Sequence, residues 1–213
     1  MSINYNSEID FFNKIINHVE LIFDVGTCDE SIYLDCDKTV HYFEPYTKYL
    51  DALKNKADVN KNFFFNNFGL SDENKEIDFY LDTYSCIKRP HSKSTPSRVS
   101  LKRGDEYMIE NNIDFIDFLK IDVECMETFV FRGFNDKLNN VKIIQFEYGP
   151  GQHEVGDNIK VMIEYLKKYG FVGFSYLYHD SPDIIPIVSM DDNWIWCNVV
   201  AYNSNFFDKS PWI

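Results

Sequence analysis

An acidic residue ends each of four strand-like runs in this sequence. Asp24 lies in IFDVG, Glu44 in VHYFEP, Asp122 in FLKIDVE and Glu147 in IIQFEYG. Polar groups at the carboxyl ends of strands in an open α/β sheet face the crevice where ligands bind, so they serve a site more often than the core. Glu147 also follows an apolar run, where an unpaired charge is costly to bury. The pattern predicts an acidic cleft that binds a ligand.

Carboxylates and histidines in such a cleft could accept a proton. Asp122 and Glu124 alternate around Val123, so on an extended segment they would share one side and could accept a proton, order a substrate or bind a cation. Capping of the next helix is the alternative for this pair. Glu147 is expected nearby, and His153 is a second candidate base in a loop. The same acids could hold a divalent ion, but no ligand spacing demands one, so no metal is predicted.

Strand-like and helix-like segments alternate along the chain and must position these groups. Strands are expected at 21–25, 40–43, 62–65, 115–121, 143–146, 171–178 and 194–202, with an extra edge strand or hairpin at 76–81. Helices are expected after a capping box at Ser7, at 29–34, after Pro45, at 105–110, at 126–131 before Gly133, and after a cap at Asp157. Residues 83–103 are expected to form a loop. The alternation predicts the α/β class, with a doubly wound, mostly parallel sheet and an antiparallel C-terminal strand pair.

Length and composition indicate one domain over residues 1–213. The chain is 45% hydrophobic, enough for one sizeable core. No run of about 18 apolar residues occurs, and the first residues are polar and acidic, unlike a signal peptide, so we expect a soluble, cytoplasmic protein. The five cysteines form no CxxC pair, which favours free thiols over disulfides or a zinc site.

The formal charge of −13 argues against general affinity for nucleic acid. The exception is a local basic strip from Lys88 to Arg103, which contains no acid. The strip could hold a phosphate or carboxylate on a small-molecule or glycan acceptor, such as a nucleotide sugar. A solvated loop is the alternative interpretation.

The ligand in the cleft is expected to carry an adenosine without a diphosphate. The GxGxxG fingerprint of dinucleotide-binding folds is absent. Glu44 lies about 20 residues beyond the first turn, where a carboxylate can accept hydrogen bonds from both hydroxyls of a ribose. S-adenosylmethionine meets these requirements, because its sulfonium and ammonium suit an acidic cleft bearing Asp24. The alternatives are a turn or cap role for Asp24 and a strand end at Glu44.

The strings IFDVG, FEP, NFGLSD, DFLKIDVE followed by METFVFRGF, and IIQFEYG resemble, in order and spacing, the FkbM-type methyltransferases. The resemblance covers roughly residues 21–149. It implies the seven-stranded, Rossmann-like methyltransferase fold, S-adenosylmethionine as cofactor, and methyl transfer to a hydroxyl, often of a sugar or a natural product. The cofactor-binding residues implied are Asp24, Gly26, Thr27, Glu44, Asn67, Leu70, Ser71 and Asp122.

The sequence departs from the family pattern at two positions. Glu30 stands where a glycine commonly lets the backbone approach the methionine part of the cofactor. Cys125 replaces the glycine of DVEG, and we expect it to begin a helix without needing a special backbone angle.

Residues and resemblance together predict an O-methyltransferase that acts on a hydroxyl of a sugar, glycan or nucleotide sugar. Asp122, Glu124, Glu147 and His153 are the candidate catalytic residues. One alternative is a ribose 2′-O-methyltransferase acting on nucleic acid, which would place a lysine such as Lys120 beside the catalytic acid. The other is a degenerate domain that binds a ligand without catalysis.

Overall fold

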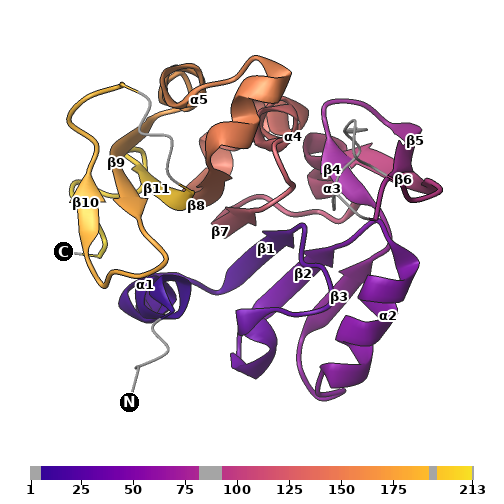
Figure 1. Ribbon diagram of the computed structural model, residues 1–213. Coiled ribbons are helices and arrows are strands. Elements are labelled where there is room, and N and C mark those ends of the chain that lie inside the picture. The colour runs from indigo at the N-terminus through magenta and orange to yellow at the C-terminus, as the bar shows by residue number, and fades with distance from the viewer. Residues whose placement is uncertain (1–5, 82–92, 192–195, 213) are drawn as a thin grey trace.

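An eight-stranded sheet forms the centre of the computed structural model, which describes residues 6–81, 93–191 and 196–212. Its strand order is β10-β9-β11-β8-β7-β1-β2-β3 (Figure 1). The strands are β1 (Leu21–Val25), β2 (Thr39–Phe43), β3 (Phe63–Asn66), β7 (Ile116–Ile121), β8 (Val141–Tyr148), β9 (Phe171–Leu177), β10 (Ile184–Pro186) and β11 (Cys197–Asn203). Strands β8, β7, β1, β2 and β3 run parallel, and β11 lies antiparallel between β8 and β9. The predicted α/β fold is confirmed.

The strand count differs from the seven expected because β10 adds an edge strand. β10 has only three residues and ends in a proline, so no alternating pattern marks it in the sequence. Trp194, the expected start of the last strand, lies outside the described residues, and β11 begins at Cys197.

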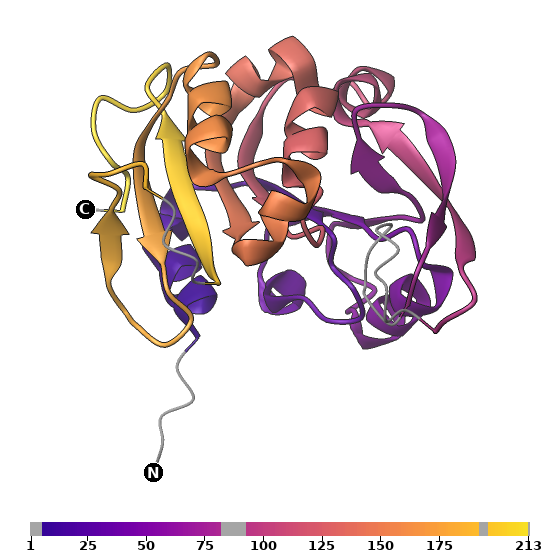
Figure 2. The same ribbon diagram turned by 45° about the horizontal axis from the view of Figure 1, so that its top comes forward.

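Helices cover both faces of the sheet, as Figures 1 and 2 show together. The α-helices are α1 (Ser7–Ile15), α2 (Thr47–Lys56), α3 (Gly104–Glu110), α4 (Glu127–Phe134) and α5 (Ile159–Lys167). The 3₁₀ turns are η1 (Ile16–His18), η2 (Ile32–Asp35), η3 (Asn135–Asn140) and η4 (Pro150–Val155). None of the helices in the described ranges is long and apolar enough to cross a membrane.

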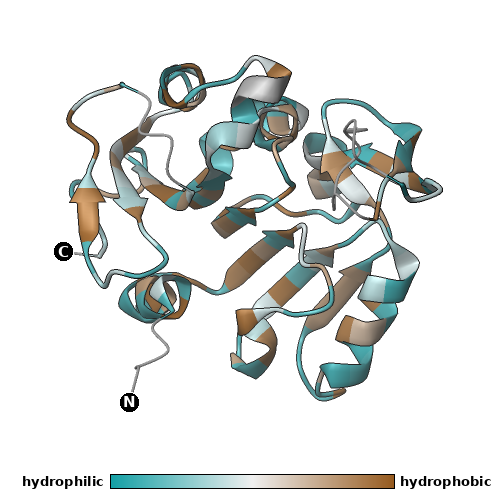
Figure 3. Cartoon of the chain, in the orientation of Figure 1, coloured by the Kyte–Doolittle hydropathy of each residue, from teal (hydrophilic) through white to brown (hydrophobic). Residues whose placement is uncertain are grey.

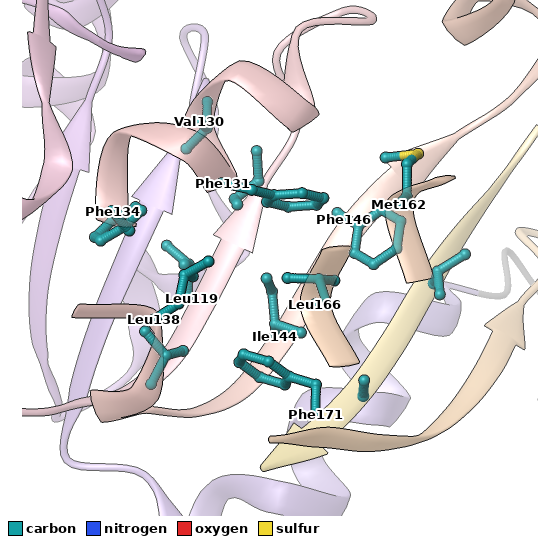
Figure 4. Close-up of a cluster of buried hydrophobic side chains, with 14 of the residues drawn as sticks. Leu119, Val130, Phe131, Phe134, Leu138, Ile144, Phe146, Met162, Leu166 and Phe171 are labelled. Atoms are coloured by element: carbon teal, nitrogen blue, oxygen red, sulfur yellow. The ribbon is translucent and has the colours of Figure 1, made fainter. Parts of the chain in front are cut away.

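Alternate residues of the central strands enter two separate cores. In β1, Ile22 joins the cluster under α1, whereas Phe23 joins the cluster under α3 and α4. Figure 4 shows the second cluster, in which α4 and α5 place Phe131 and Leu166 against strands β7, β8 and β9. Strands buried on both faces need apolar residues on both, and the central strands are accordingly brown over much of their length in Figure 3.

A second, three-stranded sheet lies at one end of the molecule (Figure 2). It pairs β4 (Gly69–Ser71) with β6 (Ser97–Arg103), and β6 with β5 (Lys75–Phe79). The strand expected at 76–81 is therefore present, but the loop expected at 83–103 is wrong over its last seven residues, which form β6. The sequence SRVSLKR is polar at alternate positions, and Arg98 pairs across the sheet with Asp78, with 3.1 Å between Nη1 and Oδ1.

Three helix starts differ from expectation. Asn6, and not Ser7, caps α1 by accepting hydrogen bonds from the amides of Glu8 and Ile9 at 3.1 and 3.2 Å. Asn158, and not Asp157, caps α5, at 3.0 Å from the Val161 amide. The helix expected at 29–34 is reduced to the single turn η2. Neighbouring Asn, Asp and Ser residues cap equally well, so the sequence gives a cap only to within a residue or two.

Gly133 lies inside α4 and does not end it. A Cβ atom at this position would lie 2.0 Å from the carbonyl oxygen of Ser71. The glycine is therefore present because helix α4 lies directly against strand β4.

Candidate functional site

A cavity of about 390 Å³ opens where β1, β2 and β7 end. Of the residues predicted from the sequence, Gly26, Thr27, Glu44, Leu70, Ser71, Asp122 and Glu124 line it. They come from four segments. Three follow the ends of β1, β2 and β7, which meet because parallel strands end at the same edge of the sheet, and the fourth is β4, a strand of the small sheet.

Glu44 is buried at the end of β2, with 4% of its surface exposed. Its two carboxylate oxygens accept the backbone amides of Cys28 at 3.0 Å and Tyr46 at 2.7 Å. Burial raises the pKa of Glu44 to about 7, although both hydrogen bonds lower it. Each oxygen keeps a second lone pair, so the carboxylate can still accept two hydroxyls.

The turn after β1 depends on Gly26, which has φ +85°. A Cβ atom there would lie 1.8 Å from the carbonyl oxygen of Asp122, so only glycine lets this turn pack against the end of β7. Thr27 follows, and its buried hydroxyl has no hydrogen-bond partner among the described residues. Glu30, the departure from the family glycine, lines the cavity, but its side chain is 85% exposed and pairs with Lys56 at 3.2 Å. Glu30 therefore leaves the cavity open.

The second sheet supplies an apolar wall that the sequence analysis did not assign to the site. Ile77, Phe79, Val99 and Leu101 from β5 and β6 line the cavity, as does Tyr49 from α2. The alternation in 76–81 predicted a strand, but nothing in the sequence placed that strand beside the glycine turn.

Asp24 lies under the turn and lines a second hollow instead of the main cavity. Its Oδ2 accepts the Ser31 hydroxyl at 2.7 Å, and its Oδ1 lies 3.9 Å from the Lys120 ammonium. Burial raises the pKa of Asp24 to about 6, while Lys120 and then the Ser31 hydroxyl lower it.

Lys120 is buried between two acids on neighbouring strands. Its ammonium lies 3.1 Å from Asp122 Oδ2 and donates a hydrogen bond to it. Burial lowers the pKa of Lys120, but the negative charges of Asp122 and Asp24 raise it by a larger amount. The net shift of the pKa is upward, so the lysine stays charged. Asp122 is partly exposed and lines the cavity. Its contact with Lys120 holds the carboxylate in that position.

Glu147 extends the acidic group around Asp122, although it is not among the residues that line the cavity. The pKa of Glu147 is raised to about 9. Burial is the largest cause, and the nearby carboxylates of Asp122, Glu127 and Glu124 also raise it. Its Oε2 is buried without a hydrogen-bond partner in the described part of the chain. Glu147 therefore carries a proton at neutral pH.

The backbone after Asp122 is left-handed at two residues, with φ +55° at Glu124 and +77° at Cys125. The expectation that Cys125 needs no special backbone angle is wrong, because this region strongly favours glycine. A buried cysteine takes the family glycine's place at a conformational cost on the order of 1–2 kcal/mol.

Glu127 connects the segment that follows β7 with the 3₁₀ turn η4. It was not identified from the sequence. This fully buried side chain accepts the Val123 amide on one oxygen and the Gln152 amide group on the other, both at 3.0 Å. Gln152 in turn accepts the Gly149 amide at 2.8 Å. Burial raises the pKa of Glu127 to about 7. An acid in the first turn of a helix whose other residues are mostly apolar was the available signal.

Two predicted residues lie elsewhere. Asn67 is exposed and accepts the Thr47 hydroxyl at 2.8 Å, while its amide group donates to the carbonyls of Glu44 and Pro45 at 3.1 Å; it fixes the turn that carries Glu44. His153 lies in η4, and its side chain is outside the described part of the structure.

Three cations of the basic strip that the structure describes are already paired with acids. Arg98 pairs with Asp78, Lys102 with Glu110 at 3.7 Å, and Arg103 with Asp105 at 2.6 Å. Lys88, Arg89 and His91 lie outside the described residues. In the ranges that are described, no group of His, Cys, Asp and Glu has the arrangement of a metal site.

The sequence matches the family described as the methyltransferase FkbM domain over residues 24–172. The chain belongs to the FkbM methyltransferase family. The match spans more than half of the chain and contains the glycine turn and all four strand-end acids. A search of curated proteins found no match.

Solved methyltransferase structures share the fold at low sequence identity. A TehB-like SAM-dependent methyltransferase from Corynebacterium glutamicum has a TM-score of 0.52 and 10% identity, covering 95% of this chain and 90% of that one. An inferred rRNA methylase from Clostridium thermocellum has a TM-score of 0.52 and 12% identity, covering 95% of this chain and 98% of that one. At these identities the similarity establishes the Rossmann-like methyltransferase fold alone.

The cavity fits S-adenosylmethionine, the cofactor that family and fold imply. Glu44 has free lone pairs for the ribose hydroxyls, and the buried Thr27 hydroxyl lacks a partner that a polar cofactor group would supply. The apolar residues of β5 and β6 offer a surface for an adenine ring.

Proposed function

We propose that this FkbM-family protein transfers the methyl group of S-adenosylmethionine to a hydroxyl of a sugar, glycan or nucleotide sugar. The observation that carries the proposal is the position of Asp122, an acid that lines the cofactor cavity and is held by Lys120. A hydroxyl becomes a good nucleophile only as its proton leaves, so a fixed carboxylate beside the methyl donor suits transfer to oxygen.

One group of residues would bind the cofactor, and another would accept and position the proton. Glu44, the Gly26 turn and the wall of β5 and β6 would hold the cofactor, whose sulfonium supplies an activated methyl carbon and leaves with the bonding electrons. Asp122 would accept the hydroxyl proton. Lys120 orients Asp122, and Glu127 fixes the backbone that follows it at Val123. Catalysis then depends mainly on alignment of the acceptor oxygen with the methyl carbon.

The test combines calorimetry with S-adenosylmethionine and a methyl-transfer assay against sugars and nucleotide sugars. Asp122→Asn should lower kcat by roughly 10²–10⁴-fold, the usual contribution of a general base, while the Kd of the cofactor stays close to that of the wild type. Asp136→Asn, an exposed acid in η3, is the matched control and should leave both unchanged. Full activity of Asp122→Asn would contradict the assigned base. A wild-type protein that releases no heat with the cofactor would instead indicate a domain without catalysis.

A ribose 2′-O-methyltransferase acting on nucleic acid is the second candidate, supported by the 3.1 Å contact of Lys120 with Asp122. The net charge of −13 opposes it. Binding to RNA that weakens steeply with salt would favour this candidate, and no binding at low salt would eliminate it.

A further inference from the structure

Strand β7, which ends at Asp122, has different neighbours on its two sides. In the main sheet β1 and β2 lie on one side of it, and β8 and β11 lie on the other. Gly26 and Glu44, from the ends of β1 and β2, line the cofactor cavity. Among the described residues, none from β8, η4 or β11 lines it. The end of β8 is therefore the side from which an acceptor can reach Asp122 beside a bound cofactor.

The end of β8 is held by the side chain of Gln152, which lies in η4 and is 1% exposed. Its Oε1 accepts the Gly149 amide at 2.8 Å, and its Nε2 donates to the Glu147 carbonyl at 3.3 Å. Gly149 in turn carries the indole of Trp196, since a Cβ atom at 149 would lie 2.4 Å from the ring. Trp196 is 42% exposed, so Gln152 fixes a segment that a ligand can contact.

The same Gln152 amide group reaches the loop that carries Asp122. Its Nε2 also donates to Glu127 Oε2 at 3.0 Å, and Glu127 Oε1 accepts the amide of Val123 at 3.0 Å. Glu127 is fully buried, which shields both hydrogen bonds from competing water. Two side chains thus connect the end of β8 with the residue that follows Asp122.

The loop after Asp122 has a backbone that needs such support. Glu124 and Cys125 both have positive φ angles, which non-glycine residues adopt only where the surrounding structure imposes them. The bond from Val123 to Glu127 spans this left-handed turn and is one of the contacts that impose it. Loss of the Glu127 contact would let the turn relax and move Asp122 with it.

We propose that Gln152 and Glu127 are positioning residues, which hold the end of β8 at a fixed distance from Asp122 and so determine where an acceptor hydroxyl lies relative to the base. The inference rests on the proposed methyltransferase function for what is being positioned. It assigns a role to Gln152, and it makes the segment after β8 the acceptor side of the site.

Three variants test the pair. Gln152→Met keeps the length of the side chain and removes its hydrogen bonds. Glu127→Gln leaves two amide groups opposite each other, so a donor faces a donor whichever way either group is turned. The double variant Glu127→Gln/Gln152→Glu reverses donor and acceptor. A carboxylate at 152 can then accept both the Gly149 amide and the amide group at 127.

Asn203→Leu is the matched control for Gln152→Met. Asn203 is fully buried, donates to the Tyr169 carbonyl at 2.9 Å and accepts the Asn205 amide at 3.0 Å. It ends β11, which runs antiparallel to β8, so it lies at the opposite edge of the sheet from Asp122. Its replacement should lower the Tm without disturbing the site.

Hydrogen exchange measured by NMR reports on the pair without any acceptor. The exchange rate of the Val123 amide is compared with that of Leu119, within β7, so that a general loss of stability cancels. This ratio should rise about three- to tenfold in Gln152→Met and in Glu127→Gln, as loss of one hydrogen bond predicts. It should return to within about twofold of the wild type in the double variant and stay there in Asn203→Leu.

Kinetics and calorimetry with S-adenosylmethionine test the consequence for transfer. Gln152→Met should lower kcat roughly ten- to hundredfold through misplacement of the acceptor, while the Kd of the cofactor stays within about threefold of the wild type. The double variant should recover most of kcat, and Asn203→Leu should keep it. A merely structural role of the pair would predict equal losses of kcat in Gln152→Met and Asn203→Leu.

The two proposals fail in different ways. An unchanged exchange ratio in Gln152→Met, or no recovery of the ratio in the double variant, would overturn the positioning pair whatever the protein catalyses. Full kcat in Gln152→Met would also overturn it and would leave the methyltransferase function intact. A wild-type protein that releases no heat with S-adenosylmethionine would instead remove the proposed function.

Discussion

Glu44 has two roles that depend on its charge in different ways. Its carboxylate holds the turns at Cys28 and Tyr46, yet burial makes it easier to protonate than an ordinary glutamate. Accepting two ribose hydroxyls requires the ionised form, because a protonated carboxyl has lost one acceptor site.

The affinity for S-adenosylmethionine should therefore rise with pH. The pKa of Glu44 is raised to about 7, so affinity should increase from pH 6 to pH 8 by up to about tenfold, as the ionised fraction grows. Glu44→Gln keeps the side-chain shape and one acceptor oxygen, and should bind more weakly with little pH dependence. Calorimetry at several pH values measures both. Equal pH dependence in the wild type and Glu44→Gln would assign the titration to another group.

The strand-end acids could be predicted at the residue scale because their positions follow from local sequence. Each follows an apolar run, and the ends of parallel strands meet at one edge. The left-handed angles at Glu124 and Cys125 could not be predicted, since both residue types disfavour them and the surrounding packing imposes them. The contact of Glu127 with Gln152 joins residues 25 positions apart and leaves no local pattern.

At the scale of elements, the site depends on the close contact between α4 and β4. Gly133 brings the helix against the Ser71 backbone, and Ser71 lines the cofactor cavity. A larger residue would separate the small sheet from the main body.

Gly133→Ala should lower the free energy of unfolding by about 1–3 kcal/mol, the usual cost of overpacking, even though alanine favours helices. Gly156→Ala is the comparison: its φ is +81° but the Cβ would meet no atom within 4 Å, so the cost should be roughly 1 kcal/mol, from conformation alone. Urea denaturation of both variants measures the difference. A smaller loss for Gly133→Ala than for Gly156→Ala would contradict the tight contact.

Elements with strong periodicity were predicted well, and those defined by their neighbours were not. The bounds of β1 are as expected, and those of α2 and α5 follow their apolar faces. β6 was expected to be loop because residues 83–103 contain two prolines and several serines, and its pairing with β5 and β4 is not visible in its own sequence. β10 is too short to give a signal.

At the scale of the whole molecule, buried acids determine how stability varies with pH. Burial raises the pKa of Asp24 to about 6, of Glu44 and Glu127 to about 7, and of Glu147 to about 9. The folded state thus binds protons more tightly than the unfolded chain between the ordinary carboxyl range and these values. Under linkage, the free energy of unfolding then falls as pH rises through this window.

We expect the Tm to be higher at pH 6 than at pH 9, with a difference in unfolding free energy on the order of a few kcal/mol. The net charge of −13 acts in the same direction, because more ionised acids repel one another at high pH. Glu127→Gln removes one of these titrations and should flatten the dependence between pH 6 and 8. A Tm that rises from pH 6 to pH 9 would refute this account. Asp37 and Asp58 have lowered pKa values, but they act only at lower pH and are exposed.

The apolar wall from β5 and β6 has a consequence for motion. A molecule that fills the cavity contacts both sheets at once. It therefore connects two units that otherwise meet through the contacts of α3 and α4 with β4 and β6. Amide hydrogens of the small sheet should consequently exchange with solvent more slowly when the cavity is filled, in step with those of β1 and β2. Dissociation of the ligand would then increase the mobility of the small sheet before that of the main sheet.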